Sequence, residues 1–97
     1  MNKSVLIRTD GITVEVEHVT APPLRFLQES VGGHIELVPF FTKYKGRNCK
    51  AFCNGDRKLP VNDYATKAAG MVLVGDVIIL VGDDDFLSKA GDRRASS

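Results

Sequence analysis

The residues of this chain with the clearest capacity for chemistry are basic side chains in its middle. Residues 43–58 hold six of them against one acid, Asp56, although the 97-residue chain has a formal net charge of only +1. Together with Tyr44, they can meet an anionic ligand such as a nucleotide phosphate through charge-assisted hydrogen bonds and aromatic stacking. The alternative is a solvated loop with its usual lysines. The six are Lys43, Lys45, Arg47, Lys50, Arg57 and Lys58.

A catalytic set of nucleophile, base and oxyanion donors cannot be assembled by spacing. The two histidines, His18 and His34, lie near no motif of the serine or cysteine hydrolase kind. We expect both at the surface or at the ends of strands. The sequence therefore favours a protein that is not an enzyme.

Metal and cofactor sites are not expected either. Cys49 and Cys53, with two scattered histidines, do not match the ligand spacing of zinc sites. On one strand their Cα atoms would lie about 13 Å apart, too far for a disulfide. The acidic run at residues 83–85 lacks the spaced ligands of a calcium loop, so it is interpreted as a helix cap. We expect no metal and no cofactor.

Composition describes an ordinary small domain. Hydrophobic residues make up 43% and charged residues 26%, which suits one globular core. The near-neutral charge argues against nucleic acid as a partner. With no signal-peptide pattern and no apolar run of about 20 residues, a cytoplasmic protein without a membrane partner is expected. We expect a single α+β domain over residues 1–90 and a flexible C-terminal tail over residues 91–97.

Residues 24–41 form the unit around which the other elements are placed. Helical spacing of apolar residues predicts a helix over 24–31, with Thr20 as cap and Pro22 or Pro23 in its first turn. Arg25 and Glu29 are spaced for an i,i+4 ion pair. Gly32-Gly33 should end the helix, and because they follow it they face the negative end of its dipole, which is unsuited to phosphate. A strand is expected over 34–41.

A hairpin is predicted at the N-terminus. Strands over 4–8 and 12–17 flank Asp10-Gly11, a strong turn signal. The strict alternation of the second strand puts Ile12, Val14 and Val16 on one face, which we expect to be core.

The second half should add two or three strands and a helix. Strand 49–53 follows a basic loop over 42–48, and Asn62 caps a helix over 64–69 that Gly70 ends. The apolar runs 71–74 and 77–81 predict a hairpin or a strand with a glycine bulge in the middle of the sheet, followed by a helical turn ending at Ser88. The fold class is α+β, a small mixed or antiparallel sheet in the order β-β-α-β-β-α-β-β, with a partly closed barrel as one form.

Several of these turn and cap residues form a recognisable pattern. Over residues 22–82 the chain resembles a small family catalogued only as a domain of unknown function and frequent in bacteriophages and other mobile elements. The resemblance implies a phage-like origin and a compact, non-catalytic role. The basic residues 42–50 and both cysteines lie outside its pattern. The matching residues are Leu27-Gln28-x-x-Val31-Gly32-Gly33-x-Ile35-Glu36, Asn54, Leu59-Pro60-x-Asn62-x-x-Ala65-Thr66 and Val74-Gly75-Asp76-Val77.

Two polar residues of that pattern need partners. Gln28 lies on the apolar side of its predicted helix and Glu36 within an apolar strand, where burial without a hydrogen bond costs about 1–3 kcal/mol. They can be satisfied structurally, by the amides of Gly32-Gly33 or by Arg25. Alternatively they line a ligand pocket with Asn54, Asn62 and Thr66.

Two functions follow as hypotheses. The first is a non-enzymatic phage or mobile-element accessory protein that sequesters a small anionic ligand, such as a nucleotide immune signal, in the host cytosol. A homo-oligomer is expected, with a second subunit completing the pocket. The alternative is a protein-interaction module that inhibits a host protein through an edge strand or the basic hairpin. The predicted ligand-binding residues are Gln28, Glu36, Tyr44, Arg47, Asn54, Arg57, Lys58, Asn62 and Thr66.

Overall fold

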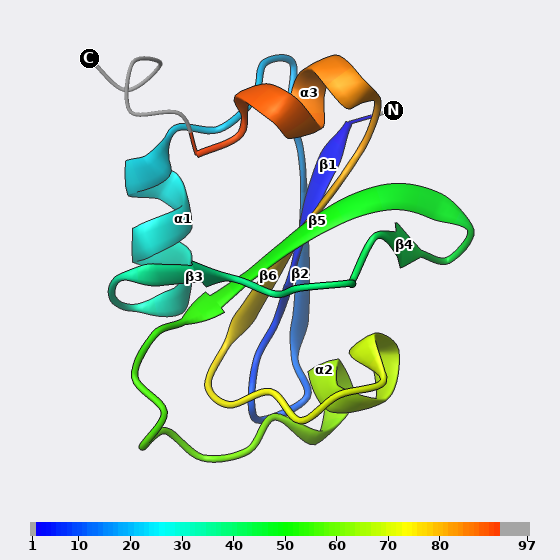
Figure 1. Cartoon of the computed structure of the whole chain (residues 1–97). Coiled ribbons are helices and arrows are strands. Elements are labelled where there is room, and N and C mark those ends of the chain that lie inside the picture. The colour runs from blue at the N-terminus through cyan, green and yellow to red at the C-terminus, as the bar shows by residue number, and fades with distance from the viewer. Residues whose placement is uncertain (1, 92–97) are drawn as a thin grey trace.

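The computed structural model, which describes residues 2–91, is an α+β fold with one six-stranded antiparallel sheet and three helices (Figure 1). The predicted fold class is confirmed, but the order of elements is β-β-α-β-β-β-α-β-α. Of the tail predicted for 91–97, only Gly91 lies within the described residues. The elements are β1 (Lys3–Ile7), β2 (Thr13–Glu17), α1 (Leu24–Val31), β3 (Ile35–Leu37), β4 (Lys43–Tyr44), β5 (Arg47–Asn54), α2 (Asp63–Ala69), β6 (Val77–Val81) and α3 (Asp84–Lys89).

The sheet is open, with β2 and β3 at its two edges. Its order is β2-β1-β6-β5-β3, and β4 pairs with the start of β5. β6 lies in the middle, as predicted, and all five of its residues are buried. Its side chains alternate between the two faces, so both faces of the sheet carry a core.

Different elements cover these two faces. On one face α1 and α3 contribute Leu27 and Phe86, which pack with Ile78 and Leu80 of β6. On the other face Val38, Phe41, Ala65 and Leu73 pack over Ile79. Figure 1 shows α1 and α3 in the upper part of the molecule and α2 below them. The connecting segments thus supply much of the second core.

The prediction that Ile12, Val14 and Val16 are core was wrong. Their exposed fractions are 53%, 42% and 41%. The alternation itself holds, since Val14 lies opposite Leu6 and Val16 opposite Ser4. β2, however, is an edge strand that pairs only with β1 among the described residues 2–91, and every residue in it is exposed. The sequence correctly predicted that these three side chains share one face of the sheet, but it wrongly predicted that this face is buried at β2.

The strand predicted for residues 71–74 does not form either. This segment makes a single bridge, between Val74 and Val61, and runs beside the sheet. The strand predicted for 34–41 is limited to Ile35–Leu37. Pro39 has no N–H for a ladder, and Phe40 adopts a left-handed φ of 63°, so the chain turns away.

The basic loop predicted for residues 42–48 contains a hairpin. β4 and β5 pair through Lys43–Asn48 and Tyr44–Arg47. Lys45 and Gly46 between them have φ of 50° and 81°, as the primed turns of tight hairpins require. The basic side chains therefore project from a regular element.

The helix boundaries follow local signals except at the start of α1. Thr20 does not cap it; the helix starts after Pro23 with no side-chain cap. Its predicted stop at Gly32 is confirmed by a φ of 80°, and Arg25 pairs with Glu29 at 3.1 Å. α3 is capped by Asp83, whose carboxylate accepts the N–H of Phe86. Within residues 2–91 no helix is long and apolar enough to cross a bilayer.

Candidate functional site

The predicted ligand-binding residues lie in separate places rather than around one pocket. Glu36, Asn54 and Arg57 line a groove beside β3. Asn62 and Thr66 lie at the start of α2, and Tyr44 and Arg47 lie on the β4–β5 hairpin. Gln28 is half-buried on α1 and Lys58 is exposed in the turn after β5. The structure thus brings three of the nine together.

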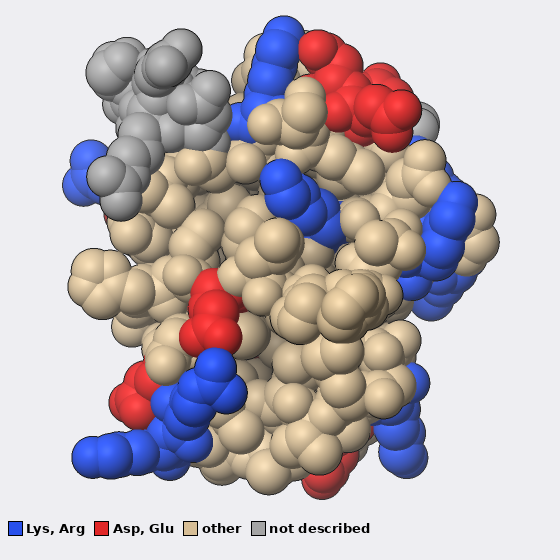
Figure 2. Space-filling model, viewed as in Figure 1, with Lys and Arg blue, Asp and Glu red and all other residues tan. Residues whose placement is uncertain are grey.

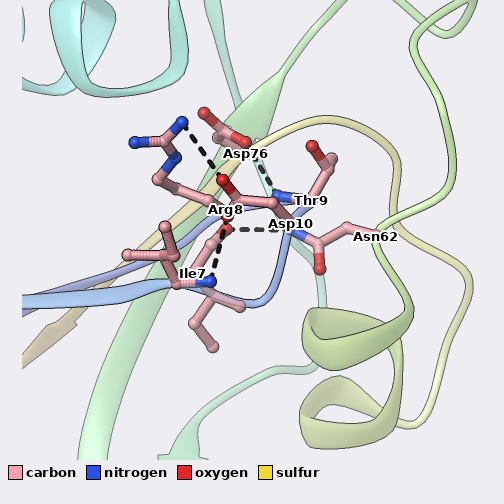
Figure 3. Close-up of polar contacts among 7 residues, drawn as sticks. Ile7, Arg8, Thr9, Asp10, Asn62 and Asp76 are labelled. Atoms are coloured by element: carbon pink, nitrogen blue, oxygen red, sulfur yellow. Dashed lines mark hydrogen bonds and ion pairs between the residues drawn. The ribbon is translucent and has the colours of Figure 1, made fainter.

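Asn62 is a structural residue at the junction of β1, α2 and β6 (Figure 3). Its side chain is fully buried. Its Nδ2 donates to the carbonyls of Ile7 and Gly75, both at 2.9 Å, and its Oδ1 accepts the N–H of Ala65 at 3.0 Å. Both amide N–H groups are therefore engaged within the protein.

The same junction is held by the turn that joins β1 to β2. The N–H of Thr9 donates to the Asp76 carboxylate at 3.0 Å, and Arg8 and Asp10 form an ion pair at 3.3 Å (Figure 3). On α2, Thr66 Oγ1 accepts the N–H of Leu73 at 3.0 Å. These polar groups fasten elements to each other, so this region is a scaffold.

On the face shown in Figure 2, Lys and Arg form several separate groups. Several of the basic side chains of residues 43–58 have partners. Arg57 pairs with Glu36 at 2.8 Å, and Lys43 donates to Asn48. The ammonium of Lys45 lies 5.4 Å from the Tyr44 ring centroid. Lys43, Tyr44 and Lys45 line one pocket, whereas Arg57 lies beside β3, so the basic residues are divided between separate places.

On the β4–β5 hairpin the positive charge meets the acidic residues of β2. Arg47 lines a groove together with Lys3, Glu15 and Glu17. A hydrogen bond and the charge of Lys3, with a smaller contribution from Lys45, lower the pKa of Glu15. This hairpin is therefore electrostatically engaged with its own sheet.

The groove beside β3 combines a polar rim with apolar walls. Its volume is about 440 Å³, and it lies between residues 36–39 and residues 71–74. Arg57 and Glu36 form an exposed ion pair at the rim. Asn54 holds the end of β5 in place, since its Nδ2 donates to the Val31 carbonyl at 3.0 Å and its Oδ1 accepts the N–H of Asp56 at 2.8 Å. The groove is nearly neutral.

A ridge formed by residues 37–40 separates this groove from a second one. The second groove has a volume of about 390 Å³ and lies between residues 37–42 and α3. Phe40 on the ridge is 93% exposed. Its φ of 63° is uncommon for a bulky residue, and such strain costs about 1–3 kcal/mol.

Sequence reasoning missed Phe40 because it placed this residue inside a strand over 34–41. The structure ends that strand at Leu37 and puts Phe40 in a turn with a left-handed φ of 63°. Phe41 next to it is buried in the core, whereas Phe40 is exposed. Nothing in the sequence pattern pointed to this turn.

The backbone of β3 is also open on its outer side. Val38 donates its N–H to the carbonyl of Ala51, and Gly55 donates to that of His34, both at 2.9 Å. Hydrogen-bonding residues alternate along an antiparallel strand, so the N–H and C=O of Leu37 point away from β5. Exposed apolar side chains flank this edge, with Leu37 at 50% and Val72 at 72%.

Neither the cysteines nor a metal cluster adds chemistry. Cys49 and Cys53 are free thiols, and burial raises the pKa of both, that of Cys49 to about 11. They are therefore protonated near neutral pH and poorly nucleophilic. In the part of the chain that the structure describes, no three His, Cys, Asp or Glu residues are grouped to hold a metal ion.

His18 and Ser4 form a pair that resembles a base and its nucleophile. His18 Nε2 and Ser4 Oγ lie 2.8 Å apart. Ser4 is only 1% exposed, however, and the imidazole packs edge-on against Phe26. A substrate cannot reach this hydroxyl, so the pair is structural.

This environment predicts a pH dependence of stability. Burial lowers the pKa of His18 below its usual value of about 6.5. As pH falls below that value the unfolded chain binds the proton first, so the free energy of unfolding should decrease until the folded pKa is reached and then level off. Urea titrations across this range should show the decrease in the natural protein and lose it in His18→Asn. If the free energy of unfolding falls equally with pH in both proteins, the decrease does not come from His18.

Comparisons with known proteins add no relative: no family model, no curated protein and no solved structure matches this chain. The resemblance to the mobile-element family therefore stays a prediction from the residues quoted for it.

Proposed function

We propose that this chain is a non-enzymatic binding module that captures an extended segment of another protein at the edge of β3. The observation that carries this proposal is Phe40, a bulky aromatic residue held almost fully exposed on a strained backbone, where it lines the groove next to α3. Neither the exposure nor the strain is explained by packing within the described fold. Both are expected of an anchor for a partner.

The free backbone of β3 supports the same proposal. An extended segment can hydrogen-bond to the N–H and C=O of Leu37 and continue the sheet, as in other cases of strand addition. Pro39 cannot donate, so the added ladder is short. Most of the affinity should then come from side chains that enter the grooves on either side of the ridge.

Charge and lining indicate which segment fits. The wall at residues 71–74 is apolar, and the nearby Arg57 and Glu36 neutralise each other. A strongly charged peptide would find no counter-charge there without breaking that pair. We expect a segment with two or three apolar side chains at alternate positions and little net charge.

Sequestration of a small anionic ligand stays as a second hypothesis. The groove volume of about 440 Å³ falls in the range of small-molecule sites, about 300–1,000 Å³. Arg57 can supply a charge-assisted donor if it leaves Glu36. The mobile-element resemblance suggests the setting for either hypothesis, namely the inhibition of a host protein or the removal of a host signal.

Selection of displayed peptides of random sequence on the immobilised chain tests the first hypothesis. We expect apolar, extended peptides whose binding is lost in Leu37→Asp and kept in Val19→Asp, a control at a fully exposed valine in the loop before α1. Nucleotides added in excess should not displace these peptides. Retention of a nucleotide, together with failure to select any peptide sensitive to Leu37→Asp, would overturn the proposal in favour of the small ligand.

A further inference from the structure

The second edge of the sheet, β2, has the features of an unpaired interface. All five of its residues are exposed, although Val14 and Val16 lie on the face that α1 and α3 cover farther along the sheet. Two backbone hydrogen bonds flank the β1–β2 ladder, from the N–H of Arg8 to the carbonyl of Ile12 and from the N–H of His18 to the carbonyl of Asn2. With the register of the ladder, they place the N–H and C=O groups of Val14 and Val16 toward β1. The N–H and C=O groups of Thr13, Glu15 and Glu17 consequently point to the open edge.

We propose that β2 pairs antiparallel with β2 of a second copy of this chain, around a two-fold axis at Val14, so that two sheets become one. This interface lies at the opposite edge from β3 and is independent of the function proposed above. A two-fold interface uses the same surface on both subunits, so the strand must complement itself.

Only one register satisfies both the backbone and the side chains. Open-edge residues must face open-edge residues, so the axis passes through a residue and not between two. Within residues 12–17, about three or more residues stay paired only with the centre at Thr13, Val14, Glu15 or Val16. Centres at Glu15 and Val16 place glutamates directly opposite each other, which is unfavourable. A centre at Thr13 leaves Val16 opposite the charged Asp10. The centre at Val14 pairs Val14 with itself and Ile12 with Val16.

This register also suits the polar face of the strand. Thr13 of each copy faces Glu15 of the other, and the two hydrogen-bonded pairs supply about four backbone hydrogen bonds. The two Glu15 side chains become diagonal neighbours, but each is held by its own Lys3, whose Nζ lies 2.8 Å from the carboxylate. The opposite face gains a continuous apolar strip from Ile12, Val14 and Val16 of both copies, which removes their exposed surface from water.

Sedimentation of the purified chain over a wide range of concentrations tests the proposal. We expect a reversible monomer–dimer equilibrium in which Val14→Lys, which sets two like charges against each other on the axis, raises the dissociation constant at least about tenfold. Val61→Lys, at an exposed valine away from β2, should leave the dissociation constant unchanged. A chain that stays monomeric at millimolar concentration would overturn the proposal.

Cross-linking tests the register itself. At a non-hydrogen-bonded position on the axis the two Cα atoms lie about 4.5 Å apart, within disulfide range. Val14→Cys should therefore form a covalent dimer under mild oxidation. The natural chain is the control, because it shows how much cross-linking Cys49 and Cys53 give on their own. Val16→Cys, whose predicted neighbour is Ile12, should not exceed that control. Cross-linking through Val16→Cys but not Val14→Cys would overturn the register.

Discussion

Asn62→Asp should destabilise the fold by about 3–5 kcal/mol, the largest effect of a single polar substitution that we expect in this chain. The aspartate keeps the acceptor that caps α2 but removes both N–H donors. The buried carbonyls of Ile7 and Gly75 then lose their partners and face a carboxylate instead. The free energy of unfolding from urea titration, with its slope, measures the effect.

An ordinary helix cap provides the comparison. Asp83 caps α3 through one part-buried hydrogen bond from the N–H of Phe86, so Asp83→Ala should cost about 1 kcal/mol, the usual value for a cap. If Asn62→Asp costs no more than Asp83→Ala, then Asn62 acts only as a cap and does not join β1 to the start of β6.

Phe40→Gly should leave the free energy of unfolding within about 1 kcal/mol of the natural chain and weaken binding of a selected peptide at least about tenfold. The side chain is almost fully exposed, so little packing is lost, and glycine adopts the left-handed φ without strain. The greater freedom of glycine in the unfolded chain offsets part of this relief. Unfolding titrations and peptide titrations measure the two effects separately.

The adjacent Phe41 provides the control. It is 5% exposed within the core, so Phe41→Ala should cost about 3–5 kcal/mol of stability. If Phe40→Gly weakens peptide binding without loss of stability while Phe41→Ala loses stability, then Phe40 is a binding anchor and Phe41 a core residue. A loss of more than about 2 kcal/mol in Phe40→Gly would show instead that Phe40 supports the fold.

Local signals explain which parts of the fold the sequence predicts. The predicted hairpin turn forms at Asp10-Gly11, and the predicted helix ends form at Gly32 and Gly70. The predicted cap of α2 is Asn62. Each of these features depends on backbone conformation or on hydrogen bonds within a few residues. β6 was placed correctly in the middle of the sheet because an unbroken apolar run suits a strand covered on both faces.

Properties that depend on distant segments were missed. Alternation shows which residues of β2 share a face, but whether anything covers that face depends on helices elsewhere in the chain. The apolar residues 71–74 run beside the sheet without joining it, and of the four only Leu73 is buried. At the candidate site, Glu36, Asn54 and Arg57 were predicted and do meet, whereas the apolar ridge with Phe40 was not predicted.

The most direct measurement of the central claim is amide hydrogen exchange at β3, resolved by residue, with and without a selected peptide. The account predicts that the Leu37 N–H, which points to the open edge, becomes protected when peptide binds. The Val38 N–H already donates to Ala51 and should change little. Saturating peptide that leaves Leu37 exchange unaltered, while shifting residues elsewhere, would contradict capture at the β3 edge.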